Sequence, residues 1–328
     1  MFFLGQMRVV ARGLPIVIAA CSLYGAADDE PSPTPPTEDA GSSESSVADA
    51  LGDELLVEAG ARCDLSKPFG TPKQVPGINT TEPELNIWLS DDEKTAYVTV
   101  IRAAVALRWD IYTTSRTNRD DAFGPLARMT DLDLDTANTE DLTLTPDGLF
   151  AAFSSSRPPS DASTSDLFIA TRMVATAPFT NVTPIANVND PDDDENPFLT
   201  TDGLELFFNS LRDGGTWELF HAVRGTGGSF GAPVNAGVGP GAANATLTRD
   251  GLTLYFTRID ASGSSDIWIA KRASSTAPFL DAKPVDELSS PERDVPGWVS
   301  PDGCRLYFMS ARAEGPGGYD QWFADKPP

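Results

Sequence analysis

The fold of this chain is decided by the stretch Val299-Ser300-Pro301-Asp302-Gly303-Cys304-Arg305-Leu306-Tyr307-Phe308-Met309-Ser310. An apolar strand ends before an Asp-Gly turn, and a second strand with alternating apolar residues follows, which is typical of a β-hairpin. Further copies occur at residues 144–153, 199–208 and 247–256, and a degenerate copy occurs at 89–98. Because a repeat reveals an architecture more surely than any single motif, these five turns are the starting point for the whole chain.

Each turn belongs to a unit of roughly 50 residues with four strands, which is the pattern of a β-propeller blade. The third strand of a unit starts with an acidic residue followed by apolar and aromatic residues, as in Asp266-Ile267-Trp268-Ile269-Ala270. The equivalent strands start at Asp110, Asp166, Glu218 and Asp320. A fourth strand is introduced by a phenylalanine, namely Phe123, Phe179, Phe230 and Phe279.

The two ends of the repeat complete each other. The sequence stops at Pro328, just after the third strand of the last unit, and residues 68–75 match residues 278–285, which lead the fourth strand of the preceding unit. We therefore expect this early strand to complete the last blade, which removes a free sheet edge. The prediction is an all-β, five-bladed propeller of four-stranded antiparallel blades. A six-bladed alternative would need a blade in the acidic segment before it, whose composition argues against one.

The chain has three cysteines, and two of them fit this closure. Aligning Phe69 with Phe279 places Cys63 just after a third-strand position, while Cys304 begins the second strand of the last blade. Antiparallel neighbours bring the start of one strand beside the end of the other. We therefore predict a Cys63–Cys304 disulfide, which an oxidising compartment permits. The alternative is two unpaired thiols.

Residues 1–21 have the features of an export signal. Arg8 and Arg12 precede an apolar run at residues 13–20, which is too short to span a bilayer. Ile18-Ala19-Ala20-Cys21 resembles the bacterial lipobox, which implies lipidation at Cys21, and Ser22 after it favours the outer membrane by the same resemblance. An ordinary secretory signal is the alternative, and translation could start at Met1 or Met7.

Residues 22–60 are rich in Asp, Glu, Ser, Thr, Pro and Ala. Such a composition cannot bury enough apolar surface to offset the entropy of ordering, so we expect a disordered tether. The propeller domain is predicted to occupy residues 61–328. The protein is thus expected to be an exported outer-membrane lipoprotein that faces the periplasm or the cell surface.

The composition excludes some functions. The formal net charge is −24, which argues against nucleic acid as a partner because phosphates would be repelled. One histidine, His221, and three cysteines are a poor inventory for transition-metal or Ser-His chemistry.

Acidic and amide residues gather in the loops that enter the inner strands, which converge on one mouth of a propeller channel. Counting back from each turn assigns Glu84, Asp194 and Asp294 to one equivalent position. Asn86, Asp141, Asn196 and Asn244 share another. These seven residues are the predicted ligand-binding ring. It could hold a basic peptide, a sugar or Ca²⁺, which prefers oxygen ligands; no other cofactor is expected. A solvated acidic rim is the competing interpretation.

Two further sets recur once per unit: the acids that start the third strands, and arginines that follow the second strands. The arginines are Arg102, Arg157, Arg212 and Arg312, with Arg258 displaced by two positions in the fourth unit. We expect both sets to satisfy backbone groups or to pair with a neighbouring blade, because buried polar groups need such partners.

The repeated Ser-Pro-Asp-Gly, Leu-Tyr-Phe and Asp-Ile-Trp phrases resemble the WD40-like repeat called PD40, which builds the propeller of the periplasmic TolB family and of many bacterial lipoproteins. The resemblance covers residues 63–328 and implies a fold more than a function. The chain departs from TolB in showing five units instead of six and no preceding α/β domain, which puts a role in the Tol-Pal system in doubt.

The resulting functional hypothesis is a monomeric, lipid-anchored, non-catalytic propeller that binds an envelope protein or glycan at the channel mouth. The alternative is a carbohydrate-active hydrolase that uses axial carboxylates, since work on a glycosidic bond needs two carboxyl groups several ångströms apart. A purely structural envelope component is the third possibility.

Overall fold

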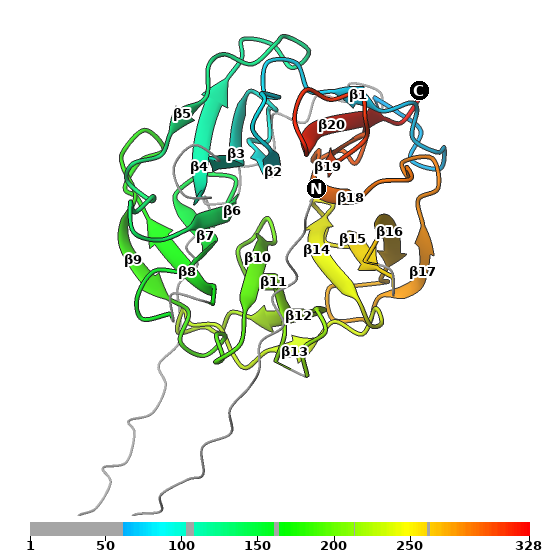
Figure 1. The fold of residues 1–328 in the computed structure, drawn as a ribbon. Coiled ribbons are helices and arrows are strands. Elements are labelled where there is room, and N and C mark those ends of the chain that lie inside the picture. The colour runs from blue at the N-terminus through cyan, green and yellow to red at the C-terminus, as the bar shows by residue number, and fades with distance from the viewer. Residues whose placement is uncertain (1–61, 103–107, 161–163, 213, 261–262) are drawn as a thin grey trace, which may run out of the picture. The chain divides into compact units, whose positions relative to one another are not determined.

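Five four-stranded antiparallel sheets form a ring in the computed structural model (Figure 1), which describes residues 62–102, 108–160, 164–212, 214–260 and 263–328. All regular structure in these ranges is β-strand. The predicted five-bladed, all-β propeller is confirmed, and the described residues form five blades rather than the six of the alternative. Residues 57–328 make up one compact unit. The predicted signal, Cys21 and the tether lie outside the described residues.

The strands follow the predicted order within each blade. The first blade contains β2 (Glu84–Leu89), β3 (Thr95–Arg102), β4 (Arg108–Ser115) and β5 (Ala127–Arg128). The second contains β6 (Thr139–Leu144), β7 (Phe150–Ser155), β8 (Asp166–Thr171) and β9 (Thr180–Pro184). The third contains β10 (Asp194–Leu199), β11 (Glu205–Ser210), β12 (Glu218–Val223) and β13 (Val234–Asn235). The fourth contains β14 (Ala242–Leu247), β15 (Thr253–Ile259), β16 (Ser265–Lys271) and β17 (Leu280–Pro284). The fifth contains β18 (Asp294–Val299), β19 (Arg305–Ser310) and β20 (Asp320–Asp325), with β1 (Lys73–Gln74) on its outer edge.

The repeated Asp-Gly phrase forms the hairpin between the first two strands of each blade. In the second blade the Asp147 carboxylate accepts hydrogen bonds from the Thr145 hydroxyl at 2.6 Å and from the Leu149 N–H at 3.0 Å. Gly148 follows with a φ of 68°, a conformation that glycine adopts without steric cost. The first blade has Glu93 at this place with a φ of 58°, which is why its copy of the phrase looks degenerate.

Each inner strand has a β-bulge near its start, where the register with the second strand shifts. Asp141, Asn196 and Asn244 lie in three of these bulges with φ between 50° and 58°. Asn and Asp tolerate this left-handed conformation better than other residues with a side chain. The bulge therefore selects the residue type at this position whether or not a ligand binds there.

The N–H group at the bulge is bound by the preceding blade. Thr99 Oγ1 accepts from Asp141 N at 3.0 Å, Ser154 Oγ from Asn196 N at 3.0 Å, and Asn209 Oδ1 from Asn244 N at 2.8 Å. These acceptors occupy one equivalent position on the second strands. We call these bonds the bulge bonds.

The bulge bond is missing between the fourth and fifth blades. The equivalent residue of β18 is Pro296, which has no N–H. The equivalent acceptor, Thr257 Oγ1, is buried without a hydrogen-bond partner. Packing alone therefore joins the two strands at this position.

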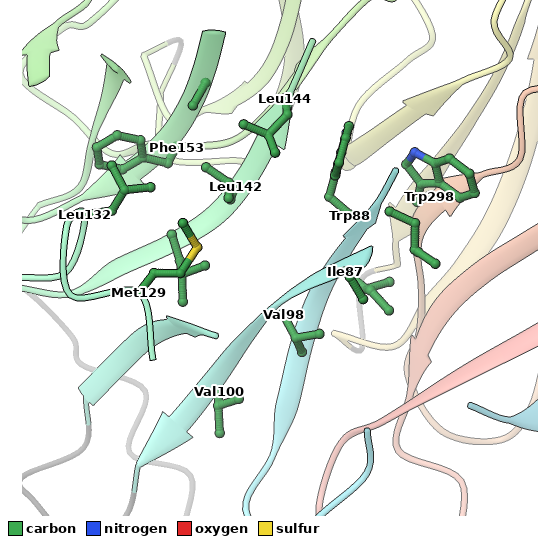
Figure 2. Close-up of a cluster of buried hydrophobic side chains, with 14 of the residues drawn as sticks. Ile87, Trp88, Val98, Val100, Met129, Leu132, Leu142, Leu144, Phe153 and Trp298 are labelled. Carbon is green, nitrogen blue, oxygen red and sulfur yellow. The ribbon is translucent and has the colours of Figure 1, made fainter. Parts of the chain in front are cut away.

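Apolar side chains fill the space between blades. Figure 2 shows one such cluster, in which Trp88 of β2 and Trp298 of β18 lie near Leu142 and Leu144 of β6. The cluster thus combines residues of the fifth, first and second blades. The inner strands β18 and β2 are in contact, so the ring is closed between the last blade and the first.

The closure is the predicted one. Strand β1 pairs with β20 in antiparallel register, with Lys73 opposite Phe323 and Gln74 opposite Trp322. Phe69 is buried in the same apolar cluster as Trp322. Cys63 and Cys304 form a disulfide with Cα atoms 5.7 Å apart, which is the pairing expected from the sequence. The early segment of the chain is thereby fixed to the last blade by the pairing of β1 with β20 and by the disulfide bond.

The arginines after the second strands bind the backbone, as expected. Arg157, Arg212 and Arg312 each donate to a carbonyl oxygen of the loop that enters their own blade, at 2.6, 2.7 and 2.8 Å. Arg258 binds the Val238 carbonyl in the same way, whereas Arg102 pairs with Asp110 inside its blade. The guanidinium groups of the first three also lie over aromatic rings of their blades.

A second cationic repeat was not predicted. It lies six residues after each third-strand acid and consists of Arg116, Arg172, Arg224, Arg272 and Lys326. Each cation lies over the ring of the phenylalanine that introduces the fourth strand, for example 4.2 Å from Phe123 for Arg116 and 4.7 Å from Phe279 for Arg272. Cation–π contacts of this kind are favourable when partly desolvated. They fix the outer strand of each blade.

Among the described residues there is no helix with the length and apolarity required to cross a bilayer.

The disulfide joins residues 241 positions apart. Because it removes loop entropy from the unfolded chain, we expect Cys63→Ala to lower the free energy of unfolding by about 4–5 kcal/mol in the entropic model. Urea denaturation of oxidised protein measures the loss. Cys304→Ala and the double variant should match it, and wild-type protein with a reductant should fall to the same value. Equal stability of oxidised and reduced wild-type protein would contradict the expectation.

Candidate functional site: an acidic cavity at one mouth of the channel

A cavity of about 480 Å³ opens where the inner strands begin. Its lining consists of Leu85, Asn86, Trp109, Asn138, Glu140, Asp141, Ser156, Thr164, Ser165, Asp193, Glu195, Asn196, Asn244, Val295, Pro296, Gly297 and Met309. We call it the acidic cavity. Every blade contributes to it through the first residues of its inner strand or the adjacent loops, so the cavity lies on the propeller axis.

The two sides of the acidic cavity differ in chemistry. The second and third blades contribute four carboxyl groups, those of Glu140, Asp141, Asp193 and Glu195. The first and fifth blades contribute mainly apolar groups, namely Leu85, Trp109, Val295, Pro296 and Met309. No lysine or arginine is among the described residues that line it. The cavity can therefore hold a ligand with one polar or charged side and one apolar side.

Four of the seven predicted ligand residues line the acidic cavity: Asn86, Asp141, Asn196 and Asn244. Their side chains contact one another around the axis. Asn86 donates to the Asp141 carboxylate, and Asn244 Nδ2 donates to Asn196 Oδ1. We call these four residues the polar belt. Beyond the belt the free space shrinks to about 10 Å³, so the cavity ends there.

The other three predicted residues, Glu84, Asp194 and Asp294, do not face the axis, and the prediction is wrong for their position. All three are fully buried. Their carboxylates turn back to the loop that enters the blade and accept N–H hydrogen bonds from Thr80, Asp190 and Ser290, each four residues earlier. Asp194 and Asp294 also pair with Arg212 and Arg312, both at 2.7 Å. The reason is that an acidic residue at this position closes its own entry loop.

The sequence did not single out Glu140 and Glu195, which occupy the second position of β6 and β10. The equivalent residues of the other blades are Leu85, Ala243 and Val295, so this position does not recur as an acid and repeat alignment passes over it. A usable signal existed. The second residue of the inner strand is apolar in the other three blades, which indicates that this position faces the space around the axis. An acidic residue at such a position in two blades is therefore unusual.

Burial raises the pKa of three carboxyl groups in the acidic cavity, those of Glu140, Asp141 and Glu195. The pKa of Glu195 rises to about 8, mainly through burial and then through the charges of Asp141 and Asp193. The pKa of Glu140 is raised well above its ordinary value by burial, Asp141 and Glu195. The pKa of Asp141 rises to about 6 through burial, although hydrogen bonds from Asn86 and Ser154 oppose the shift. Like charges in a poorly solvated site hold protons that isolated carboxyls would release.

The arrangement does not resemble a metal centre. Among the described residues, no group of three or more His, Cys, Asp or Glu side chains is placed to hold a metal ion. His221 lies elsewhere, with Nδ1 2.8 Å from Glu205 Oε1 and its ring stacked on Phe207.

No family model matches this sequence, and no curated protein matches it. Solved structures do resemble it. TolB from Acinetobacter baumannii is 17% identical with a TM-score of 0.46, over 75% of this chain and 55% of that one, so the chain spans about half the length of that TolB. A putative TolB from Agrobacterium tumefaciens is 14% identical with a TM-score of 0.47, over 76% and 92% of the two chains.

Glycoside hydrolases are similar to the same extent. An α-L-arabinofuranosidase from Podospora anserina, solved in complex with cellotriose, is 12% identical with a TM-score of 0.50, over 80% of this chain and 98% of that one. At such identities the resemblance shows the fold alone. The binding chemistry of this chain must therefore be argued from the acidic cavity.

The buried pair of Asp194 and Arg212 gives a test of the corrected role. We expect Asp194→Ala to lower the free energy of unfolding by about 3 kcal/mol, because it removes the nearer of the two carboxylates that pair with Arg212 and leaves only Asp190 at 3.4 Å. Asp194→Asn keeps an acceptor for the Asp190 N–H and should lose less. Chemical denaturation measures both, with the exposed neighbour variant Asp192→Ala as the control. Wild-type stability in Asp194→Ala would show that the residue is not structural.

The raised pKa of Glu195 makes stability depend on pH. Since this pKa moves from the ordinary 4.5 to about 8, the folded state holds more protons than the unfolded chain between these values. Stability therefore falls as the pH rises through this window. We expect the melting temperature of Glu195→Gln to decrease less than that of wild type between pH 4.5 and pH 8, because glutamine does not titrate. Asp286→Asn, at an exposed site, should keep the wild-type profile, and parallel curves for Glu195→Gln and wild type would refute the assignment.

Proposed function

We propose that this protein is an exported, lipid-anchored propeller that binds an envelope protein or glycan in the acidic cavity and catalyses no reaction. The single observation that carries the proposal is the cavity itself, a concavity of about 480 Å³ on the propeller axis with convergent polar groups. A concave, partly apolar site with a few oriented polar groups is the usual form of a ligand-binding site.

The rest of the cavity supports binding over catalysis. Three of the polar belt residues, Asp141, Asn196 and Asn244, are held by bulge bonds, and Asn86 is held by its hydrogen bond to Asp141, which is the arrangement of a rigid recognition surface. Rigid, preorganised groups lower the cost of ordering a site on binding. The described lining residues contain no histidine, cysteine or lysine that could act as a nucleophile or general base.

Export and anchoring rest on other parts of the chain. The sequence of residues 1–21 supports export with lipidation at Cys21, and the Cys63–Cys304 disulfide suits an oxidising compartment. The resemblance to PD40 lipoproteins supports an outer-membrane location facing the periplasm or the cell surface. The negative charge of the chain supports partners other than nucleic acid, and a monomer is the expected state because the closed ring leaves only short outer strands as edges.

A carbohydrate-active hydrolase is the second candidate. One observation favours it: the acidic cavity holds carboxyl groups with different pKa values, about 8 for Glu195 and about 6 for Asp141. Glycoside hydrolysis uses one protonated and one ionised carboxyl group. Turnover of any member of a glycan panel by wild-type protein, lost in both Glu140→Gln and Glu195→Gln, would establish this candidate and overturn the non-catalytic proposal.

A matched pair of leucine substitutions tests binding. Leu85→Trp fills the acidic cavity, whereas Leu280→Trp makes the same change at a residue of β17 that is 61% exposed. In crosslinking from native membranes, we expect Leu85→Trp to lose at least about tenfold in capture, which corresponds to about 1.4 kcal/mol. Leu280→Trp should capture as wild type does. Equal capture by a correctly folded Leu85→Trp protein, judged by its melting temperature, would show that partners do not use the cavity.

A further inference from the structure

Most buried carboxylates elsewhere in this propeller are matched by arginines, and the exceptions, Glu84 and Asp320, accept hydrogen bonds from the Thr80 and Gly317 N–H groups. Asp194 and Asp294 each have one arginine, at 2.7 Å. Glu205 pairs with Arg272 at 2.8 Å, and Glu93 lies within 3.6 Å of three arginines. This pattern is expected, because a buried charge without a partner is costly.

The acidic cavity departs from this pattern. The Glu140 carboxylate has no hydrogen-bonding or ion-pair partner among the described residues, although the residue is half-buried in the wall of the cavity and its environment disfavours its charge. Glu195 accepts a hydrogen bond from the Ser165 side chain, and Asp193 accepts one from the Ser165 N–H at 2.9 Å. Neither acid has a cation beside it. The arginines that pair with most other buried carboxylates of the structure are missing here, and Glu140 also lacks the hydrogen bonds that Glu84 and Asp320 receive.

The volume and the lining of the cavity indicate what kind of cation fits it. A volume of about 480 Å³ far exceeds one ion, and the described acids are not grouped as metal ligands. Opposite the acids lie Leu85, Val295 and Met309, which offer contact to hydrocarbon and nothing to a charge. A ligand that satisfies both walls has a cationic head and an apolar stem.

We propose that the acidic cavity binds an organic cation, a protonated amine or guanidinium on an apolar stem, with Glu140 and Glu195 facing the charge and Leu85 and Met309 facing the stem. This inference rests on the proposed binding function and specifies its chemistry. The same head and stem occur in a lysine or arginine side chain of a partner protein and in a free alkyl amine. The two sources differ only in what continues beyond the cavity mouth.

The affinity of the cavity for an organic cation should depend on the ionisation of Glu140 and Glu195. The acids must be ionised to face a cation, so binding releases protons from Glu140 and Glu195. Affinity should therefore increase as the pH rises toward 8, the pKa of Glu195 in the free protein, while an alkyl amine stays protonated. Added salt should weaken binding only modestly, because buried charges are screened less than exposed ones.

The test is isothermal titration of the full-length protein with spermidine, with a lysine-containing peptide and with the same peptide acetylated on its lysine. We expect the cationic probes to bind and the acetylated peptide to bind at least about tenfold more weakly, or about 1.4 kcal/mol. Glu140→Gln/Glu195→Gln should reduce the affinity for the cations by a similar factor. Asp286→Asn/Glu292→Gln, which changes the net charge equally at exposed sites, should not. Tighter binding of the peptide than of spermidine identifies a partner side chain as the source, and the reverse identifies a free amine.

Three results would overturn the inference. The first is equal binding of the acetylated and unmodified peptides. The second is binding of calcium chloride, and not of amines, that depends on Glu140 and Glu195. The third is no binding of any probe. The proposed function would survive each of them if capture from membranes remained sensitive to Leu85→Trp, and it would fail separately if that sensitivity were absent.

Discussion

The bulge bond is the interaction on which most of the polar belt depends. At three blade junctions a second-strand side chain of one blade accepts the N–H of a residue that the next blade holds in a left-handed conformation. That conformation favours Asn and Asp. The constraint that joins these neighbouring blades thus selects three of the four polar belt residues, Asp141, Asn196 and Asn244, at the channel mouth. Architecture and recognition surface share one origin in this propeller.

Two repeated sets of cationic side chains lie farther from the axis than the bulge bonds. Arginines that follow the second strands bind the entry loops of their blades, and the second cationic repeat covers the phenylalanines at the outer edge. Most buried carboxylates outside the acidic cavity are compensated by arginines within the chain. Toward the axis, in the second and third blades, four acids line the cavity without a cation among the described lining residues. The framework of the propeller is therefore largely balanced in charge, and the described lining of the acidic cavity is not.

The fold could be predicted from the sequence because its signals repeat. The Asp-Gly turns recur in every blade for a local reason, the Asp147-type hydrogen bonds, and the match of residues 68–75 to 278–285 revealed the closure. The site could be predicted only in part. Counting from the turns identified Asn86, Asp141, Asn196 and Asn244 correctly as facing the cavity. Counting alone could not show that Glu84 bends back onto Thr80, since that depends on a hydrogen bond in three dimensions. Glu140 and Glu195 were passed over because a binding site breaks the symmetry that repeat analysis relies on.

The pairing of β1 with β20 has a consequence for how the protein matures in the cell. The segment around Phe69 is synthesised long before its partners around Trp322. It therefore stays unpaired until β20 has emerged, and such long-range pairing is intrinsically slow. A chain interrupted before β20 would lack the strand that joins β1 to β19. Ring closure thus tests whether synthesis has proceeded through β20.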